Sequence, residues 1–234
     1  MKKKYVQVGL GGRARFFYEA IASTYHQTCE LVGFCDVSQT RMDYANRVLV
    51  NKYGQKKVKT CMPSQFEQLL DDVQPDEVII TSVDRTHHDY IIRAMRKGYD
   101  VICEKPLTID EEKAQEIITV QKQTGRNLRV TFNYRYAPYH TKIKELLEKD
   151  IIGDVFSVHF EWLLNTQHGA DYFRRWHRNK HNSGGLLVHK STHHFDLVNF
   201  WLSSQPKKVF AFGELNFYGM HNAERRGVET FYSR

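Results

Sequence analysis

A glycine-rich turn near the N-terminus constrains the fold of this chain more than any other feature. The apolar residues 5–8 lead directly into Gly9-Leu10-Gly11-Gly12-Arg13-Ala14, the pattern G-x-G-x-x-A. After a strand, the first glycine allows a tight turn, the second lets the backbone approach a pyrophosphate, and the small third residue lets the next helix pack closely. The N–H groups that open that helix attract phosphate. The pattern predicts dinucleotide contacts from Gly9, Gly11, Gly12, Arg13 and Ala14.

The second apolar run, residues 31–35, ends at Asp36. A dinucleotide-binding unit carries an acidic residue at this distance from its glycines, where it binds the ribose hydroxyls. A carboxylate there repels a 2′-phosphate, which favours NAD over NADP. Arg41 is close enough in sequence to leave NADP open as the cofactor.

Strand-like and helix-like segments then alternate. Strands are expected at residues 58–61, 77–80, 100–103 and 128–132, and helices from the turn to about residue 25 and at about 42–53, 64–72, 87–97 and 110–123. Ser64 and Glu67 match a capping box for the third of these helices. The alternation predicts an α/β fold, a Rossmann-like doubly wound parallel sheet over residues 1–133.

The stretch Val101-Ile102-Cys103-Glu104-Lys105-Pro106-Leu107 ends a buried strand at a carboxylate, an amine and a proline. A polar turn is the simplest interpretation. The carboxyl edge of a parallel sheet, however, is where such folds bind ligands. We therefore expect cofactor contacts there from Thr81, Ser82, Val83, His87, Glu104, Lys105 and Asn133, although packing explains His87 equally well.

The pattern changes after Asn133. A helix is expected at 139–149, a half-buried strand where Phe156, Val158, Phe160 and Trp162 alternate with polar residues, a helix at 185–202, and a strand at 209–217. The polar, His- and Arg-rich residues 165–182 are interpreted as a loop over a site. These features predict a second, α+β domain over residues 134–234, built on a mostly antiparallel open sheet that is incomplete with two strands.

Taken together, the motifs resemble the glucose-fructose oxidoreductase/inositol dehydrogenase/MocA (Gfo/Idh/MocA) family. The resemblance covers essentially the whole chain and rests on the glycine pattern, Asp36, Glu104-Lys105-Pro106, Asn133-x-Arg135, Ile152-Gly153-Asp154-Val155, and Gly184-Gly185 followed by His193-x-x-Asp196. It implies an NAD(P)-binding domain and a second domain with an open antiparallel sheet. It also implies a sugar or polyol substrate that reacts at a secondary alcohol.

The resemblance also implies roles for individual residues. Lys105 is expected near the nicotinamide and the substrate hydroxyl, and His193 is expected to be the general acid/base. His189 stands where the family commonly has Asp, so its substrate-binding role and the sugar are open; Arg135, Trp176 and His177 are further substrate-binding candidates. Family members usually continue for longer, so the substrate domain is expected to be cut short, with a homo-oligomer through its sheet possible if the sheet is complete.

The chemistry requires these residue types. A secondary alcohol loses its hydroxyl proton to a base while the cofactor carries the hydride. Histidine has a suitable pKa unperturbed, and a partly desolvated lysine beside a cation has a lowered pKa. His189 and His193, four apart, are expected to share one helix face; the alternatives are packed histidines or, with His177, His181 and Asp196, a metal site. Lys190 replaces the glutamate of H-E-x-x-H and no cysteine is near, so no metal is predicted.

Three functions fit these features. The first is an NAD(P)-dependent sugar or polyol dehydrogenase. The second is an NAD-dependent glycosidase or lyase in which tightly held cofactor takes and returns the hydride without net redox. The third is a non-catalytic nucleotide-binding sensor, which the short second domain makes plausible.

Composition excludes other classes. The 234 residues carry a formal charge of +7 but no long basic run or nucleic-acid motif, so no nucleic-acid partner is expected. Four cysteines without C-x-x-C spacing predict buried free thiols in a reducing compartment. No apolar stretch is long enough to span a bilayer, and the basic start leads into glycines rather than a signal-peptide core, so no membrane partner and a cytoplasmic location are expected.

Overall fold

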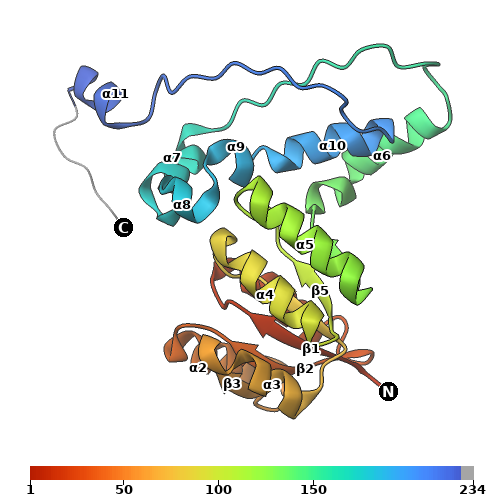
Figure 1. The fold of residues 1–234 in the computed structure, drawn as a ribbon, viewed down its shortest axis with the longest axis vertical. Coiled ribbons are helices and arrows are strands. Elements are labelled where there is room, and N and C mark those ends of the chain that lie inside the picture. The colour runs from red at the N-terminus through yellow and green to blue at the C-terminus, as the bar shows by residue number, and fades with distance from the viewer. Residues whose placement is uncertain (228–234) are drawn as a thin grey trace. The chain divides into compact units, whose positions relative to one another are not determined.

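The computed structural model describes residues 1–227, and residues 228–234 of the predicted second domain lie outside that range (Figure 1). Contacts divide the chain into two units, Met1–Thr131 and Phe132–Arg234, each of which has its own architecture. Within residues 1–227, none of the helices combines the length and the apolar character needed to cross a membrane.

The first unit is built on one six-stranded parallel sheet with the order β3-β2-β1-β4-β5-β6. The strands are β1 (Lys3–Val8), β2 (Cys29–Cys35), β3 (Lys59–Cys61), β4 (Glu77–Ile80), β5 (Asp100–Cys103) and β6 (Leu128–Val130). The chain reverses its direction of travel across the sheet between β1 and β4, which is the point where doubly wound sheets bind ligands. The predicted Rossmann-like parallel sheet is confirmed.

Five α-helices connect these strands and cover both faces of the sheet (Figure 1). They are α1 (Arg15–Ala22), α2 (Gln39–Tyr53), α3 (Phe66–Val73), α4 (Asp84–Arg96) and α5 (Glu111–Thr124). One core cluster joins the sheet to α1 and α2, and a second joins it to α3, α4 and α5. Neighbouring strand residues alternate between them: Phe34 belongs to the first cluster and Cys35 to the second.

Several local predictions in the first unit differ from the structure, among them a cap and two helix ends. No capping box forms at Ser64, because a 3-10 helix begins at Pro63 and α3 starts at Phe66 without a side-chain cap. The helix expected from residue 87 starts already at Asp84, directly after the extended Val83. The first helix ends at Ala22, short of residue 25. The thiol prediction is confirmed: all four cysteines are free, although Cys29 is only half-buried.

The second unit, over its described residues, is helical. It contains α6 (Pro138–Glu148), α7 (Thr166–Arg174), α8 (Lys180–Ser183), α9 (Leu186–His189), α10 (Thr192–Leu202) and α11 (Met220–Arg225), with 3-10 helices η3 (Asn133–Tyr136) and η4 (Trp176–Arg178). The segment 165–182, expected to be a loop, therefore contains helices. The single helix expected over 185–202 is broken at Lys190 and Ser191, so His189 and His193 lie on different helices.

Two strands predicted for the second unit are absent from residues 132–227. Residues 155–165 and 208–216 form no regular secondary structure. Their apolar side chains are exposed, with Phe156 at 95 % and Phe212 at 92 % of full accessibility. A β-strand satisfies its N–H and C=O groups by hydrogen bonds to a neighbouring backbone, and these two segments are not paired in a ladder with any described residue. The predicted antiparallel sheet is therefore not formed by this part of the chain.

Candidate functional site

The turn between β1 and α1 has room for a pyrophosphate because its glycines lack side chains. Gly9 has a φ of +80°, and a Cβ added there would lie 2.5 Å from the backbone N and Cα of Ser82. A Cβ on Gly11 or Gly12 would meet no heavy atom within 4 Å, so the backbone there is open to a ligand. Ala14 is buried beneath the turn. The turn fits the backbone cradle of a dinucleotide.

The carboxylate of Asp36 is buried at the end of β2, beside the same turn. Its Oδ2 accepts a hydrogen bond of 2.5 Å from the backbone N–H of Leu10, and its Oδ1 accepts one of 2.8 Å from the N–H of Ser38. Arg41, whose side chain is exposed, lies 3.9 Å from Oδ1. The strong backbone bonds hold the carboxylate in place, where it fits the diol of a ribose.

Glu104 links the glycine turn to the Glu104-Lys105-Pro106 motif. Its backbone N–H donates to the carbonyl oxygen of Ile80 at 2.9 Å, which places it at the carboxyl edge of the sheet. Its Oε1 accepts a hydrogen bond of 2.5 Å from Nε of Arg13, and its Oε2 accepts one of 3.0 Å from the backbone N–H of Lys105. The buried carboxylate of Glu104 thus orients both the guanidinium of Arg13 in the glycine turn and the backbone at Lys105.

Two other residues predicted to contact the cofactor at this edge, Thr81 and His87, contact backbone carbonyl oxygens of the protein. The hydroxyl of Thr81 donates to the carbonyl oxygen of Gly9 at 2.6 Å. The ring nitrogens of the buried His87 lie 2.8 Å from the carbonyl oxygen of Pro106 and 3.1 Å from that of Ser82. Thr81 therefore supports the glycine turn, and His87 supports the loop that carries the lysine.

Asp84 interacts electrostatically with His87, Glu104 and Lys105, although it was not among the predicted site residues. It follows Val83 as the first residue of α4 and is only 3 % exposed. Burial raises the pKa of Asp84 to about 7, against the opposing effect of the charges of His87 and Lys105. The first unit thus places a carboxyl group that titrates near neutrality within electrostatic range of Lys105.

In the second unit, His193 is buried against Tyr134 of η3. The two rings are parallel, with an interplanar angle of 4° and centroids 3.9 Å apart. The hydroxyl of Tyr134 accepts a hydrogen bond of 2.7 Å from Nζ of Lys190. Tyr134 therefore connects the candidate acid/base to a buried lysine.

His189 lies in a different aromatic group, together with Trp176 and His177. The His189 ring centroid lies 4.6 Å from that of His177 and 5.5 Å from those of Trp176 and Tyr172. The fold thus brings three of the predicted substrate-binding residues together. The break between α9 and α10 places them in a cluster distinct from the one around His193.

Arg135, the fourth predicted substrate-binding residue, pairs with Asp196. Its Nε donates to Oδ2 at 2.7 Å and its Nη2 donates to Oδ1, a bidentate pair that raises the pKa of Arg135. A cavity of about 450 Å³ opens beside this pair, between α6 and α10. Asn133, predicted to contact the cofactor, is exposed at the start of η3.

The part of the chain that the structure describes contains no group of three His, Cys, Asp or Glu residues placed to hold a metal ion. Sequence reasoning missed Asp84, Tyr134 and Lys190. Lys190 stands in a long stretch without acidic residues, and Asp84 directly follows Thr81-Ser82-Val83 at the carboxyl edge of β4; for Tyr134 the sequence carried no comparable signal.

A parallel sheet with a glycine turn, a buried carboxylate after β2 and a charged edge after β5 defines the first unit as a dinucleotide-binding Rossmann domain. Residues 3–132 match the Gfo/Idh/MocA family, described as an oxidoreductase family with an NAD-binding Rossmann fold, and residues 144–232 match its C-terminal alpha/beta domain. The chain belongs to the Gfo/Idh/MocA family, which confirms the resemblance, and its first unit is the NAD-binding Rossmann domain of that family.

Relatives span a range of names. YteT of Bacillus subtilis, described provisionally as an oxidoreductase, is 39% identical over 219 residues, which are 93% of this chain and 50% of YteT. Inositol 2-dehydrogenase of Rhizobium meliloti is 31% identical over 136 residues, 58% of this chain and 39% of that enzyme. The chain thus spans about half the length of the curated relatives it matches.

Solved structures share the fold. The scyllo-inositol dehydrogenase of Lactobacillus casei, solved with bound NAD(H) and scyllo-inositol, superposes with a TM-score of 0.70 at 23% identity. The superposition covers 87% of this chain and 57% of that structure. A myo-inositol 2-dehydrogenase from Lactobacillus plantarum has a TM-score of 0.70 at 20% identity, over 88% and 58% of the two chains.

Proposed function

We propose that this protein is an NAD-dependent oxidoreductase that transfers a hydride between the nicotinamide and a secondary alcohol of a sugar or polyol. The observation that carries the proposal is the grouping at one sheet edge of the open glycine turn, the buried Asp36 and the Glu104–Lys105 pair. Family membership and the inositol dehydrogenases among the relatives support the substrate class.

The proposed division of labour follows from the contacts. Gly11 and Gly12 leave the backbone open for the pyrophosphate, and Asp36 binds the adenosine ribose. Arg13 is a cation within the glycine turn itself, and Glu104 orients it. We assign Lys105, whose backbone the same carboxylate fixes, to the substrate hydroxyl.

The reaction needs a proton acceptor and a hydride acceptor. Bound NAD would supply the hydride acceptor for the carbinol carbon. Lys105 orients the hydroxyl, and the imidazole of His193, held flat by Tyr134, takes its proton. In the reverse direction the imidazolium returns the proton to the alkoxide oxygen. His189, Trp176, His177 and Arg135 are proposed to contact the rest of the sugar.

A screen of sugars, polyols and their keto forms for the reduced-nicotinamide absorbance tests this proposal. Lys105→Ala should abolish turnover and leave NAD affinity within about threefold, because the glycine turn and Asp36 are proposed to make most of the nucleotide contacts. The matched control is Lys122→Ala, which removes an exposed lysine on α5 and should change neither quantity. Unchanged kcat in Lys105→Ala contradicts the assignment. Aglycone release without net absorbance change identifies the glycosidase or lyase, and NAD binding without any turnover identifies the sensor.

A further inference from the structure

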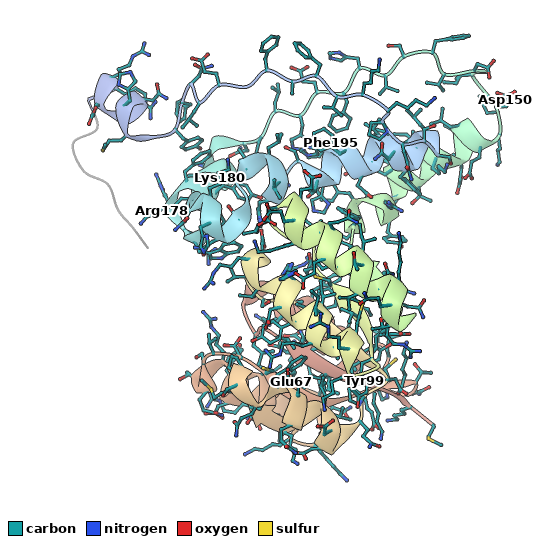
Figure 2. The ribbon with its side chains drawn as sticks, in the orientation of Figure 1. Glu67, Tyr99, Asp150, Arg178, Lys180 and Phe195 are labelled. Atoms are coloured by element: carbon teal, nitrogen blue, oxygen red, sulfur yellow. The ribbon has the colours of Figure 1, made fainter. Side chains whose placement is uncertain are left out.

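The stretch that carries the candidate acid/base is strongly positive. Between Tyr172 and Phe195 the sequence contains no Asp or Glu. The same stretch contains the cations and histidines Arg174, Arg175, His177, Arg178, Lys180, His181, His189, Lys190, His193 and His194. Figure 2 labels two of them, Arg178 and Lys180, next to and within α8, and both are exposed. An uninterrupted positive stretch attracts anions to this part of the second unit.

Within this stretch Lys190 is unusual because its cation is buried. It is 8 % exposed, and its Nζ donates to the neutral hydroxyl of Tyr134 at 2.7 Å, 5.1 Å from the centre of the same ring. Among the side chains that the structure describes, none of the Asp and Glu carboxylates lies within 4.0 Å of the Lys190 ammonium. Asp196, the next acidic residue along the chain, is paired with Arg135.

A buried ammonium without a counter-ion is unfavourable. Its effect on the surroundings is visible at His194, where burial lowers the pKa of the imidazole and the charge of Lys190 lowers it further. The tyrosine hydroxyl accepts one of the three ammonium protons, and its ring offsets only part of the charge, because neither carries a full negative charge. An anionic ligand would supply the negative charge that the described side chains around Lys190 do not.

The position of Lys190 connects this charge to the proposed chemistry. Tyr134 accepts the hydrogen bond of Lys190 through its hydroxyl and stacks on the imidazole of His193 through its ring. The ammonium and the candidate acid/base are thus two neighbours of one side chain. A ligand that reaches His193 also reaches the surroundings of Lys190.

We propose that the substrate of this protein is an acidic sugar and that Lys190 binds its anionic group, a carboxylate or a phosphate. This inference rests on the proposed function and narrows its substrate class. The acidic group offsets the buried charge of Lys190, while the alcohol to be oxidised is presented to His193.

The test compares acidic sugars with their neutral parents on the NAD-loaded, full-length protein. Galacturonate is paired with galactose, and glucose 6-phosphate with glucose, so that the two arms separate a carboxylate from a phosphate. Calorimetry is expected to show one acidic sugar binding at least about tenfold more tightly than its neutral parent. Raising the salt concentration should weaken the acidic sugar alone.

Variants then locate the effect. Lys190→Met should reduce the affinity of the acidic sugar to that of its parent and leave the parent unchanged, and Lys190→Arg should retain the preference. Lys180→Met removes an exposed cation of the same stretch and should retain it as well. A lysine with a purely structural role would lower thermal stability without discriminating between acid and parent. If Lys190→Met fails to fold, Lys190→Arg and the salt dependence of the unmodified protein decide the question.

The outcomes separate this inference from the proposed function. Equal or tighter binding of the neutral parents, or an equal loss of both ligands in Lys190→Met, overturns the inference even if sugars are turned over. Binding of acidic sugars that depends on Lys190, without reduced nicotinamide from any sugar, overturns the proposed function and retains the anion site.

Discussion

Gly9→Ala is expected to lower the unfolding free energy of the first unit for two reasons, a strained backbone conformation and a clash with Ser82. An alanine at the φ of +80° found at Gly9 costs about 1–2 kcal/mol, because its Cβ crowds the carbonyl oxygen. Its Cβ would also lie 2.5 Å from the backbone of Ser82. Backbone atoms cannot rotate away, so the ends of β1 and β4 must separate, and overpacking of this kind costs about 1–3 kcal/mol. The expected loss is about 2–5 kcal/mol, against about 5–15 kcal/mol for the stability of a typical domain.

Urea unfolding of Gly9→Ala and of two control variants measures these parts. Gly54 has a φ of +64° and would place a Cβ with no heavy atom within 4 Å, so Gly54→Ala should lose only the conformational part, about 1–2 kcal/mol. Gly11 has an ordinary φ of −71° and the same open space, so Gly11→Ala should keep its stability but weaken NAD binding. If Gly9→Ala loses no more free energy than Gly54→Ala, the close approach of the turn to Ser82 is not required. If Gly11→Ala binds NAD normally, the pyrophosphate does not lie on this turn.

Three further predictions concern charged groups. Burial raises the pKa of Asp84 to about 7, above an unfolded value of about 3.9, so the folded chain binds this proton more tightly. The stability contributed by Asp84 should therefore fall by up to about 4 kcal/mol as the pH rises from about 4 to about 7. Urea unfolding of Asp84→Asn should not show that fall. Parallel pH profiles of the variant and the unmodified protein contradict the assignment. NAD should bind more tightly than NADP, and Asp36→Ser should narrow the difference by about tenfold or more because a charge opposite the 2′-phosphate is lost; a calorimetric preference for NADP in the unmodified protein contradicts this reasoning. Arg135→Met leaves the buried carboxylate of Asp196 without its bidentate partner and should cost about 3 kcal/mol in unfolding free energy. Adding Asp196→Asn in the same background should restore part of this loss. An additive loss in the double variant would show that the two residues are not coupled.

Local sequence signals predicted the nucleotide half of the molecule well. The strands β4 and β5 begin and end at the predicted residues, and α5 begins and ends within a residue or two of its prediction. Caps explain the good boundaries, since Asp110 accepts from the N–H of Lys113 and Gly125 adopts the left-handed conformation at the end of α5. Each of these signals acts between residues a few positions apart.

Predictions that depended on distant partners were less reliable. The alternating residues 156–162 have the period of a strand, yet a strand forms only where another backbone pairs with it. His189 and His193, predicted to share one helix face, lie on separate helices because the helix is interrupted at Lys190 and Ser191. The proposed capping box failed for a local reason, the 3-10 helix that begins at Pro63.

The sequence by itself determined that this chain contains a parallel, doubly wound sheet with a glycine turn, a carboxylate after its second strand and a charged edge. Hydrophobic period, turn residues and caps act over short distances and can be read directly from the order of residues. Only the tertiary structure showed that Arg13 pairs with Glu104 and that Asp84 is buried. It also showed that Tyr134 contacts both Lys190 and His193. These contacts join residues far apart in the chain, and their charges and pKa values depend on burial and on partners that exist only once the chain has folded.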